Sequence, residues 1–345
     1  MPDLTENSNN FPSTFSRASA KWIPLAGTLT EYAVDVPSFG DSGVVVTTNC
    51  TNYCTYSDDL TNAAWTKTNC TAAAGAPTTI LGSACTKLTD SGSGGGYAEF
   101  STSYDGNIAR GFLCMMAKCA TGTVNATLYI EDSAGTPLTF SKAITVTTTE
   151  DYFYLYTGNF VDTLPLKSRI VIDDAGGEIF VNLVMVSEDS FNGQLIPTSG
   201  SAVTQSADSL VDYSVSGIPT NDYKMTCTMS FPDGASPTAY AAIYTDVDNW
   251  LRIGLGAANP YQNFKIGGAF SGGQIIDTFS PDTEYEATLT VSSTTGITVD
   301  IGGSTYTDAT KTSGIGAPTH VSVGNSFGSP ASGSTQVKNL KVEAL

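Results

Sequence analysis

The stretch YKMTCTMSF (residues 223–231) decides the fold class of this chain. Tyr, Met, Cys, Met and Phe occupy its odd positions, and Lys, Thr, Thr and Ser alternate with them. Successive side chains of a β-strand point to opposite faces of a sheet, so this period of two indicates a strand with one buried face. The stretches EYEATLTV (284–291) and GITVDIG (296–302) repeat the pattern. Such strands, with turn residues between them, are typical of an antiparallel sandwich.

The pattern extends towards the N-terminus of the 345-residue chain. TVNATLYIE (123–131) and LTFSKAITV (138–146) alternate in the same way. IFVNLVMV (179–186) is apolar on both faces and predicts a central strand. Charged residues make up only 14% of the chain, against about 25% in a typical domain. We therefore predict an all-β protein with two antiparallel, jelly-roll-like β-sandwiches in series behind an extended N-terminal arm.

The predicted domain limits follow from composition. Residues 1–40 carry isolated aromatic residues between Asn, Ser, Pro and Asp, which predicts an extended arm that orders against a partner. The polar stretch NGQLIPTSGSAVTQSAD (192–208) marks the boundary between the two sandwiches. We expect the arm over residues 1–40, the first sandwich over 41–200 and the second over 201–345.

The net charge of −18, with a sequence pI near 4.2, argues against two classes of protein. A chain this acidic repels phosphate backbones and anionic lipid headgroups, so we expect no nucleic-acid partner and no membrane insertion.

The segment MPDLTENSNN (1–10) lacks the basic and apolar parts of a secretory signal. The seven cysteines are spaced unlike a zinc site, so buried free thiols are favoured, with a local disulfide within residues 50–85 as the alternative.

The residues that catalysis needs are scarce in this chain. The single histidine, His320, is predicted on the strand face opposite Val321 and Val323, and no nucleophile has a recognisable context. Paired carboxylates are the alternative, because glycoside hydrolysis uses two of them. The candidate pairs are Asp58/Asp59, Asp173/Asp174, Asp246/Asp248 and Glu284/Glu286. Turn acids or the polar face of a strand explain these pairs more simply, so we predict no enzyme and no cofactor.

Aromatic residues supply the candidate binding sites. Trp250, Tyr244 and Tyr261 are candidates for stacking on a sugar ring, with burial in a sandwich core as the alternative. Asp246 and Asp248 form a calcium candidate because Ca²⁺ takes oxygen ligands, but a hairpin turn explains the same run, and no metal is predicted. In the arm, the residues expected to dock onto a partner are Phe11, Phe15, Arg17 and Trp22.

Several motifs resemble a module of tailed-bacteriophage structural proteins. YCTYSDDLTNAAWTKTNCTAA (53–73) resembles the opening of that module, T-Y-S-E-D-F-S-N-A-A-W-T-K, most specifically in NAAWTK (62–67). FSRAS (15–19) resembles its upstream F-x-R-A-S element, and MAKCA (116–120) resembles its A-K-A-G strand end. QLIPTSGSAVTQSAD (194–208) resembles its closing motif, S-Y-I-P-T-S-G-S-A-V-T-R-A-A-D.

Residues 211–345 resemble the LamG or concanavalin-like jelly roll that often follows this module, through GITVDIGG (296–303) and NLKV (339–342). The resemblance implies that the first sandwich is a jelly roll like those of carbohydrate-binding modules. It also implies a virion component of the tail-fibre, head-fibre, spike or decoration type, usually a homotrimer. The arm would then attach the protein to capsid, portal or tail proteins of the particle.

Three functions follow from these observations. The leading hypothesis is a non-enzymatic structural protein of a bacteriophage virion, which docks by its arm and exposes sandwiches that bind host-surface polysaccharide. One alternative is a carbohydrate-binding module. The other is a depolymerising module of a tail appendage.

Overall fold

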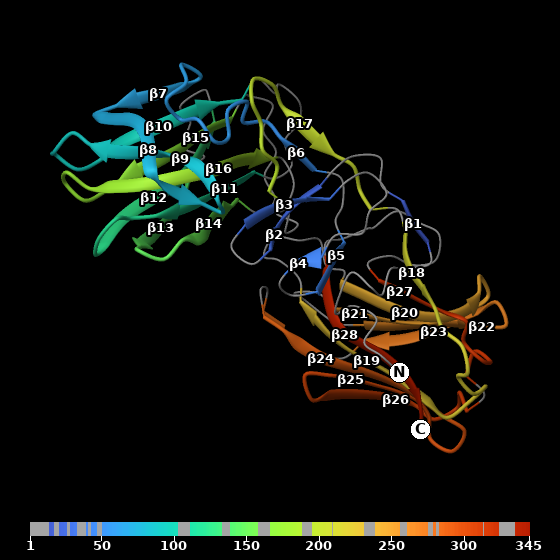
Figure 1. Cartoon of the computed structure of the whole chain (residues 1–345). Coiled ribbons are helices and arrows are strands. Elements are labelled where there is room, and N and C mark those ends of the chain that lie inside the picture. The colour runs from blue at the N-terminus through green and yellow to red at the C-terminus, as the bar shows by residue number, and fades with distance from the viewer. Residues whose placement is uncertain are drawn as a thin grey trace. The chain divides into compact units, whose positions relative to one another are not determined.

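The computed structural model describes residues 14–16, 21–25, 28–32, 39–40, 43–46, 50–102, 111–132, 139–157, 166–187, 195–208, 210–230, 239–255, 261–274, 279–280, 283–312, 314–323 and 335–345. These residues form β-strands, turns and loops, and no α-helix occurs among them, which confirms the all-β prediction (Figure 1). The described part therefore also contains no helix that could cross a membrane.

The chain divides into two compact units, each described here by itself. Unit 1 comprises Met1–Ile23, Tyr32–Asn49 and Ser206–Leu345, and unit 2 comprises Pro24–Glu31 and Cys50–Gln205. Unit 2 is thus an insertion between two parts of unit 1 along the chain. This division differs from the three predicted ranges.

Unit 1 is built from two seven-stranded antiparallel sheets. The first sheet has the order β1 (Thr14–Ser16), β18 (Leu210–Ser214), β27 (His320–Val323), β20 (Ala239–Asp246), β21 (Asn249–Leu255), β22 (Tyr261–Ile266), β23 (Ala269–Gln274). The second sheet has the order β26 (Ser304–Asp308), β25 (Gly296–Ile301), β24 (Tyr285–Ser292), β19 (Tyr223–Ser230), β28 (Thr335–Ala344), β5 (Gly43–Val46), β4 (Phe39–Gly40).

The core of unit 1 forms between these sheets. In β19, Tyr223, Met225, Cys227 and Met229 are buried and alternate with partly exposed residues, as the sequence predicts. They pack in one cluster with apolar residues of the other sheet, among them Ile243 of β20. Phe231, predicted on the same face, lies outside the described residues. The two sheets therefore form a sandwich with a single apolar core.

Unit 2 contains two five-stranded antiparallel sheets and a short two-stranded one. The first has the order β13 (Thr139–Thr147), β12 (Thr123–Asp132), β15 (Leu166–Ile172), β10 (Gly96–Ser101), β7 (Trp65–Thr68). The second has the order β14 (Asp151–Tyr156), β11 (Phe112–Lys118), β16 (Glu178–Ser187), β9 (Ser83–Asp90), β8 (Cys70–Ile80). The short sheet pairs β17 (Val203–Gln205) with β6 (Cys50–Asn52).

Strands β11 and β16 of unit 2 are buried on both faces. In β16, Val181 and Val184 belong to the core between the two five-stranded sheets, whereas Phe180 and Met185 belong to a second apolar cluster. The central strand predicted for residues 179–186 is therefore confirmed, since β16 lies in the middle of its sheet with a core on either side.

Segments from the predicted arm form strands of unit 1 and of a separate hairpin. Strand β1 pairs with β18, with Phe15 opposite Val211, and β4, at the end of the predicted arm, pairs with β5. Strand β5 itself follows the arm and pairs with β28. Trp22 lies in β2 (Lys21–Leu25), which pairs with β3 (Thr28–Tyr32). Phe11 and Arg17 lie outside the described residues. The pairs of β1 with β18 and of β5 with β28 join residues nearly 200 to 300 positions apart, so local sequence patterns do not predict them. Docking by these residues stays a prediction.

Two motifs that are far apart in the sequence lie side by side in unit 2. The buried side chain of Asn52 donates from Nδ2 to the carbonyl of Ile196 at 2.8 Å, and its Oδ1 accepts from the N–H of Val186 at 3.0 Å. Tyr56 forms a β-bridge with Ser199. The opening and closing segments of the inserted unit are therefore clasped together by buried hydrogen bonds.

All seven cysteines are buried as free thiols. Burial raises the pKa of Cys54, Cys114 and Cys227 to about 12, because a thiolate in an apolar core loses its hydration. These thiols are therefore protonated and unreactive at neutral pH.

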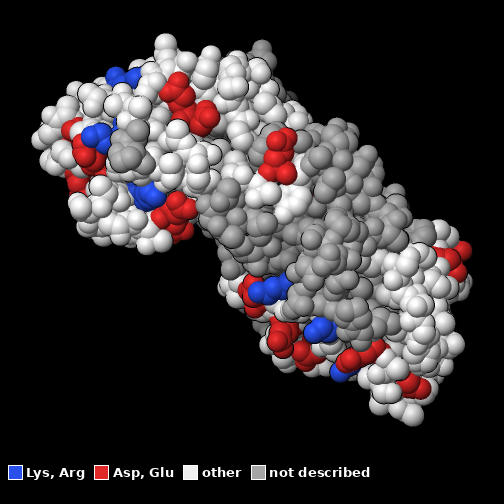
Figure 2. All heavy atoms as spheres, viewed as in Figure 1, with Lys and Arg blue, Asp and Glu red and all other residues white. Residues whose placement is uncertain are grey.

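On the face drawn in Figure 2, acidic side chains lie in small separate groups, several of them beside Lys or Arg.

Candidate functional site

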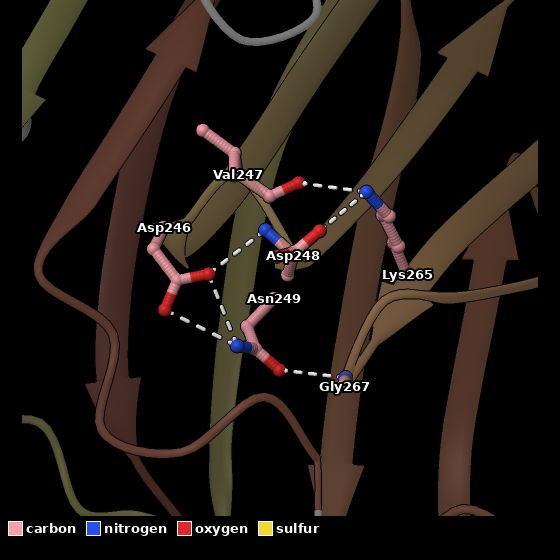
Figure 3. A network of polar contacts seen from close by, with 6 residues as sticks. All are labelled: Asp246, Val247, Asp248, Asn249, Lys265 and Gly267. Atoms are coloured by element: carbon pink, nitrogen blue, oxygen red, sulfur yellow. Dashed lines mark hydrogen bonds and ion pairs between the residues drawn. The ribbon is translucent and has the colours of Figure 1, made fainter.

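The predicted calcium candidate lies in the turn between β20 and β21 (Figure 3). Oδ1 of Asp246 accepts hydrogen bonds from the N–H of Asp248 at 2.8 Å and from Nδ2 of Asn249 at 3.0 Å. Nζ of Lys265 lies 2.6 Å from Oδ1 of Asp248. Oδ1 of Asn249 accepts from the N–H of Gly267 at 2.9 Å. The network ties the β20–β21 turn to the β22–β23 turn.

This geometry is that of the hairpin turn, the alternative to a calcium site. The carboxylate of Asp246 accepts hydrogen bonds from N–H donors of the turn. The carboxylate of Asp248 faces the ammonium group of Lys265, which takes the place of a metal cation. Among the described residues, no three His, Cys, Asp or Glu side chains are grouped so that they could hold a metal ion.

The predicted stacking residues Tyr244 and Trp250 are directly opposite each other on β20 and β21. Their side chains are only 8% and 9% exposed. Tyr244 stacks on His320 with ring centroids 5.2 Å apart, and the guanidinium of Arg252 lies 5.3 Å from the ring centroid of Trp250. Stacking on a sugar needs an open ring face. Burial in the sandwich, the alternative to sugar stacking, therefore describes Tyr244 and Trp250 better. Tyr261 begins β22, and its side chain lies outside the described residues.

Several of the paired carboxylates considered for hydrolysis make contacts within a turn or a strand pair. Asp173 and Asp174 lie in the turn after β15, where Asp173 accepts from the hydroxyl of Thr127 at 2.7 Å. Glu284 pairs with Lys338 at 2.6 Å at the start of β24. Asp59 accepts from the N–H of Thr61. These contacts give Asp173, Glu284 and Asp59 roles in a turn or a strand pair.

The structure brings together a different group of side chains on the outer face of the first sheet of unit 2. Strands β10, β15 and β12 are neighbours, and their register places Glu99 opposite Arg169 and Arg169 opposite Tyr129. Tyr97 lies two residues before Glu99 on the same face, and Glu131 two residues after Tyr129. We call this group the platform, with the members Tyr97, Glu99, Tyr129, Glu131 and Arg169.

Arg169 is held at the centre of the platform by both glutamates. Its Nε and Nη2 lie 2.8 and 2.7 Å from Oε2 of Glu99. Its Nη1 and Nη2 lie 3.2 and 2.9 Å from Oε1 and Oε2 of Glu131, a bidentate contact. The side chains of Glu99, Arg169 and Glu131 are 13%, 22% and 23% exposed. Burial opposes the charge of Arg169, but the hydrogen bond with Glu99 and the charge of Glu131 raise the pKa of the guanidinium above its ordinary value.

Two tyrosines on neighbouring strands, Tyr97 of β10 and Tyr129 of β12, flank the strand that carries Arg169. The guanidinium of Arg169 lies over the ring of Tyr97, 4.6 Å from its centroid, a cation–π contact. Tyr97 and Tyr129 are both partly exposed. The result is an outward-facing surface with two aromatic rings and with carboxylates fixed in one geometry.

The sequence carries a signal for this platform that the search for apolar positions misses. Val124, Ala126, Leu128 and Ile130 are buried in β12, as their alternation predicts. The same period places Tyr129 on the other, polar face. An aromatic residue on the polar face of an alternating strand has no core to fill, so it indicates a binding surface. Trp65, in contrast, is buried in the core.

Comparisons with known proteins give only weak similarities. No protein-family model matches the chain, and no curated protein matches its sequence. Solved structures with partial similarity include the carbohydrate-binding module CBM66 from Bacillus subtilis, at 13% identity and a TM-score of 0.32, covering 45% of this chain and 89% of that one.

Two further structures align at a similar level. The CBM22-1–CBM22-2 tandem domain of Paenibacillus barcinonensis Xyn10C has 8% identity and a TM-score of 0.32, covering 87% of this chain and 98% of that one. The galectin LEC-6 of Caenorhabditis elegans has 14% identity and a TM-score of 0.25, covering 37% and 89%. No property of these proteins transfers to this chain at such scores. The resemblance to phage structural proteins stays a prediction.

Proposed function

We propose that this chain is a non-enzymatic β-sandwich protein that binds an uncharged polysaccharide through the platform of unit 2. The observation that carries the proposal is the pair of partly exposed tyrosine rings beside an arginine fixed by two carboxylates. Aromatic faces pack against the C–H groups of a sugar, while preorganised carboxylates accept its O–H groups. A carboxylate has about four acceptor sites, so both glutamates keep capacity beyond their contacts with Arg169.

The charge of the platform favours a neutral ligand. Glu99 and Glu131 carry two negative charges, and Arg169 with Lys167 on the same strand face carries two positive ones. The chain as a whole has a net charge of −18, which repels anionic polymers. An uncharged polysaccharide avoids this repulsion and uses the hydrogen-bonding groups in full.

The same geometry argues against a depolymerase. Glycoside hydrolysis needs one carboxyl group protonated as a general acid. Arg169 contacts both carboxylates, so each is already engaged as an acceptor by one shared guanidinium. The platform is therefore suited to binding a chain and keeping it intact.

For the biological setting, we propose a structural protein of a tailed-bacteriophage particle, assembled as a homotrimer and facing host-surface polysaccharide. The motifs in residues 53–73 and 194–208 support this setting, since the segments that carry them are clasped together in unit 2. Detection of the chain by mass spectrometry in purified particles tests it, and particles that lack the chain contradict it.

Calorimetric titration of the full chain with soluble neutral glucans, mannans, galactans and xylans tests the binding function. We expect one of them to bind, and Tyr129→Ala to weaken that binding by about tenfold or more through loss of a stacking ring. Tyr306→Ala, which removes a partly exposed tyrosine of unit 1, is the matched control and keeps the affinity.

Two results would overturn this proposal. One is wild-type protein that binds none of these polymers, or binding that survives Tyr129→Ala unchanged. The other is the release of new reducing ends from the bound polysaccharide, if Glu99→Gln abolishes that release, because the platform would then be catalytic.

A further inference from the structure

A hollow of about 270 Å³ lies on the outer face of the second sheet of unit 1, where β28, β19 and β24 run side by side. Its polar lining comes from all three strands, and the described lining residues include no aromatic side chain. The side chains that the argument uses are Thr226, Thr228, Glu286, Thr288, Asn339 and Lys341.

The hollow arises from the alternation of β19 and a bulge in β28. Cys227 points into the core, so Thr226 and Thr228 face outward and form the floor. The pairing of β19 with β28 shifts register between these two threonines. At the bulge Asn339 has a φ of 55°, a left-handed conformation that Asn tolerates, and its Nδ2 donates to Oγ1 of Thr228 at 3.1 Å. A bulge of this kind re-aims a side chain, here onto the outer face of the sheet.

The two charged residues of the hollow, Lys341 and Glu286, differ in their ion pairing from the other charged residues on this face. Lys338 pairs with Glu284 at 2.6 Å, and Lys224 pairs with Glu343 at 2.8 Å. Lys341 has no ion pair among the described residues, and neither does Glu286. They lie on β28 and β24, one on each side of β19, so their strands are roughly 10 Å apart at a strand spacing of about 4.8 Å.

The hydroxyl groups of the floor are also available. Among the described residues, Thr226 and Thr288 make no side-chain hydrogen bond. The hollow thus offers an ammonium group on one wall, a carboxylate on the other, and hydroxyl groups that both donate and accept between them.

We propose that this hollow binds a single sugar ring, as a second site independent of the platform. Each hydroxyl of a sugar donates and accepts at once, which matches the mixed lining. A volume just below the roughly 300–1,000 Å³ of drug-sized ligand sites suits one ring rather than a chain. Among the described lining residues, the threonine, asparagine, lysine and glutamate groups supply the contacts for the ring.

The experiment is saturation-transfer NMR and titration of the full chain with the methyl glycosides of glucose, galactose, mannose and N-acetylglucosamine. We expect one of them to bind, and Thr226→Val and Thr228→Val each to weaken binding by about fivefold or more. Valine is isosteric with threonine and favours strands, so both variants should fold. Thr298→Val, on the same sheet face at β25, is the matched control and keeps the affinity.

The outcomes separate this site from the platform. Monosaccharide binding that persists in Tyr129→Ala and is lost in the two threonine variants supports the hollow. Binding that is lost in Tyr129→Ala and kept in the threonine variants refutes the hollow and leaves the platform standing. The absence of any monosaccharide binding by folded wild-type protein also refutes it.

Discussion

On the platform of unit 2, an arginine lies 2.7 and 2.9 Å from two glutamates, whereas in the hollow of unit 1 Lys341 and Glu286 stand on separate strands without an ion pair among the described residues. Both surfaces are outer faces of antiparallel sheets with the same alternation. The platform holds its charges against one another beside two partly exposed tyrosines. The hollow keeps its charges apart, and its described lining has no aromatic ring. On the two proposals made above, one unit recognises its ligand by stacking and the other by hydrogen bonding.

The largest effect expected is on folding of the unit that carries the platform. Trp65 is 1% exposed, packs on Phe100 with ring centroids 5.4 Å apart, and donates from Nε1 to the carbonyl of Tyr56 at 3.0 Å. Trp65→Ala should lower the free energy of unfolding of unit 2 by about 3–5 kcal/mol, because it leaves a cavity in the core. In differential scanning calorimetry, the unfolding transition of unit 2 should move to lower temperature while the transition of unit 1 stays in place.

The matched variant is Phe264→Ala, which removes a buried ring from the core of unit 1. It should move the other transition and leave the platform functional. If either variant shifts both transitions by the same amount, the two units do not unfold independently, and the comparison between their surfaces loses its basis.

A smaller effect is expected from Arg169→Met. This change leaves Glu99 and Glu131 side by side without their shared cation, so we expect about 2 kcal/mol lower stability and at least tenfold weaker polysaccharide binding. Lys167→Met is the control, since Lys167 faces the same side of β15 without an ion pair among the described residues. Titration calorimetry and urea unfolding measure both quantities. Equal effects of the two changes would mean that only net charge matters.

The smallest effect concerns acid stability. The carboxylate of Asp90 accepts hydrogen bonds from the N–H groups of Gly176, Gly94, Gly92 and Gly96, which lower its pKa to about 2. A depressed pKa stabilises the fold above the ordinary value near 3.8, and this contribution is lost as pH falls towards about 2.

Urea unfolding of the wild type and Asp90→Asn at several pH values tests this contribution. Unit 2 of the wild type should lose stability between about pH 4 and pH 2, and Asp90→Asn should be less stable at neutral pH but flatter over that interval. Parallel pH profiles for the two proteins would show that Asp90 does not supply the contribution. The hollow of unit 1 should be unaffected in either protein.

The alternation of single strands was enough to predict the fold class and much of the core. Tyr223, Met225, Cys227 and Met229 are buried as their spacing predicts. The sites were harder to predict, because they depend on register between strands. Nothing near Arg169 in the sequence indicates that Glu99, 70 positions earlier, lies opposite it.

The roles of particular aromatic and terminal residues also depend on non-local pairing. Trp250 is adjacent to acids that suggest a turn, but only the pairing of β20 with β21 places it against Tyr244 and away from solvent. The strand over Gly43–Val46 finds its partner in β28, nearly 300 residues later. A sequence read segment by segment therefore assigns this part of the chain to an arm or to the wrong sandwich.

The insertion of unit 2 within unit 1 has a consequence for the order of folding during synthesis. All residues of unit 2 have left the ribosome once Gln205 has emerged from the exit tunnel, and the pairing of β6 with β17 can then close the unit. Strands β4 and β5 must wait, because their partner β28 is translated last among the described strands. A nascent chain halted after Gln205 has emerged from the exit tunnel, but before β28 has, should thus already display the tyrosine-bearing surface, with β4 and β5 still without β28.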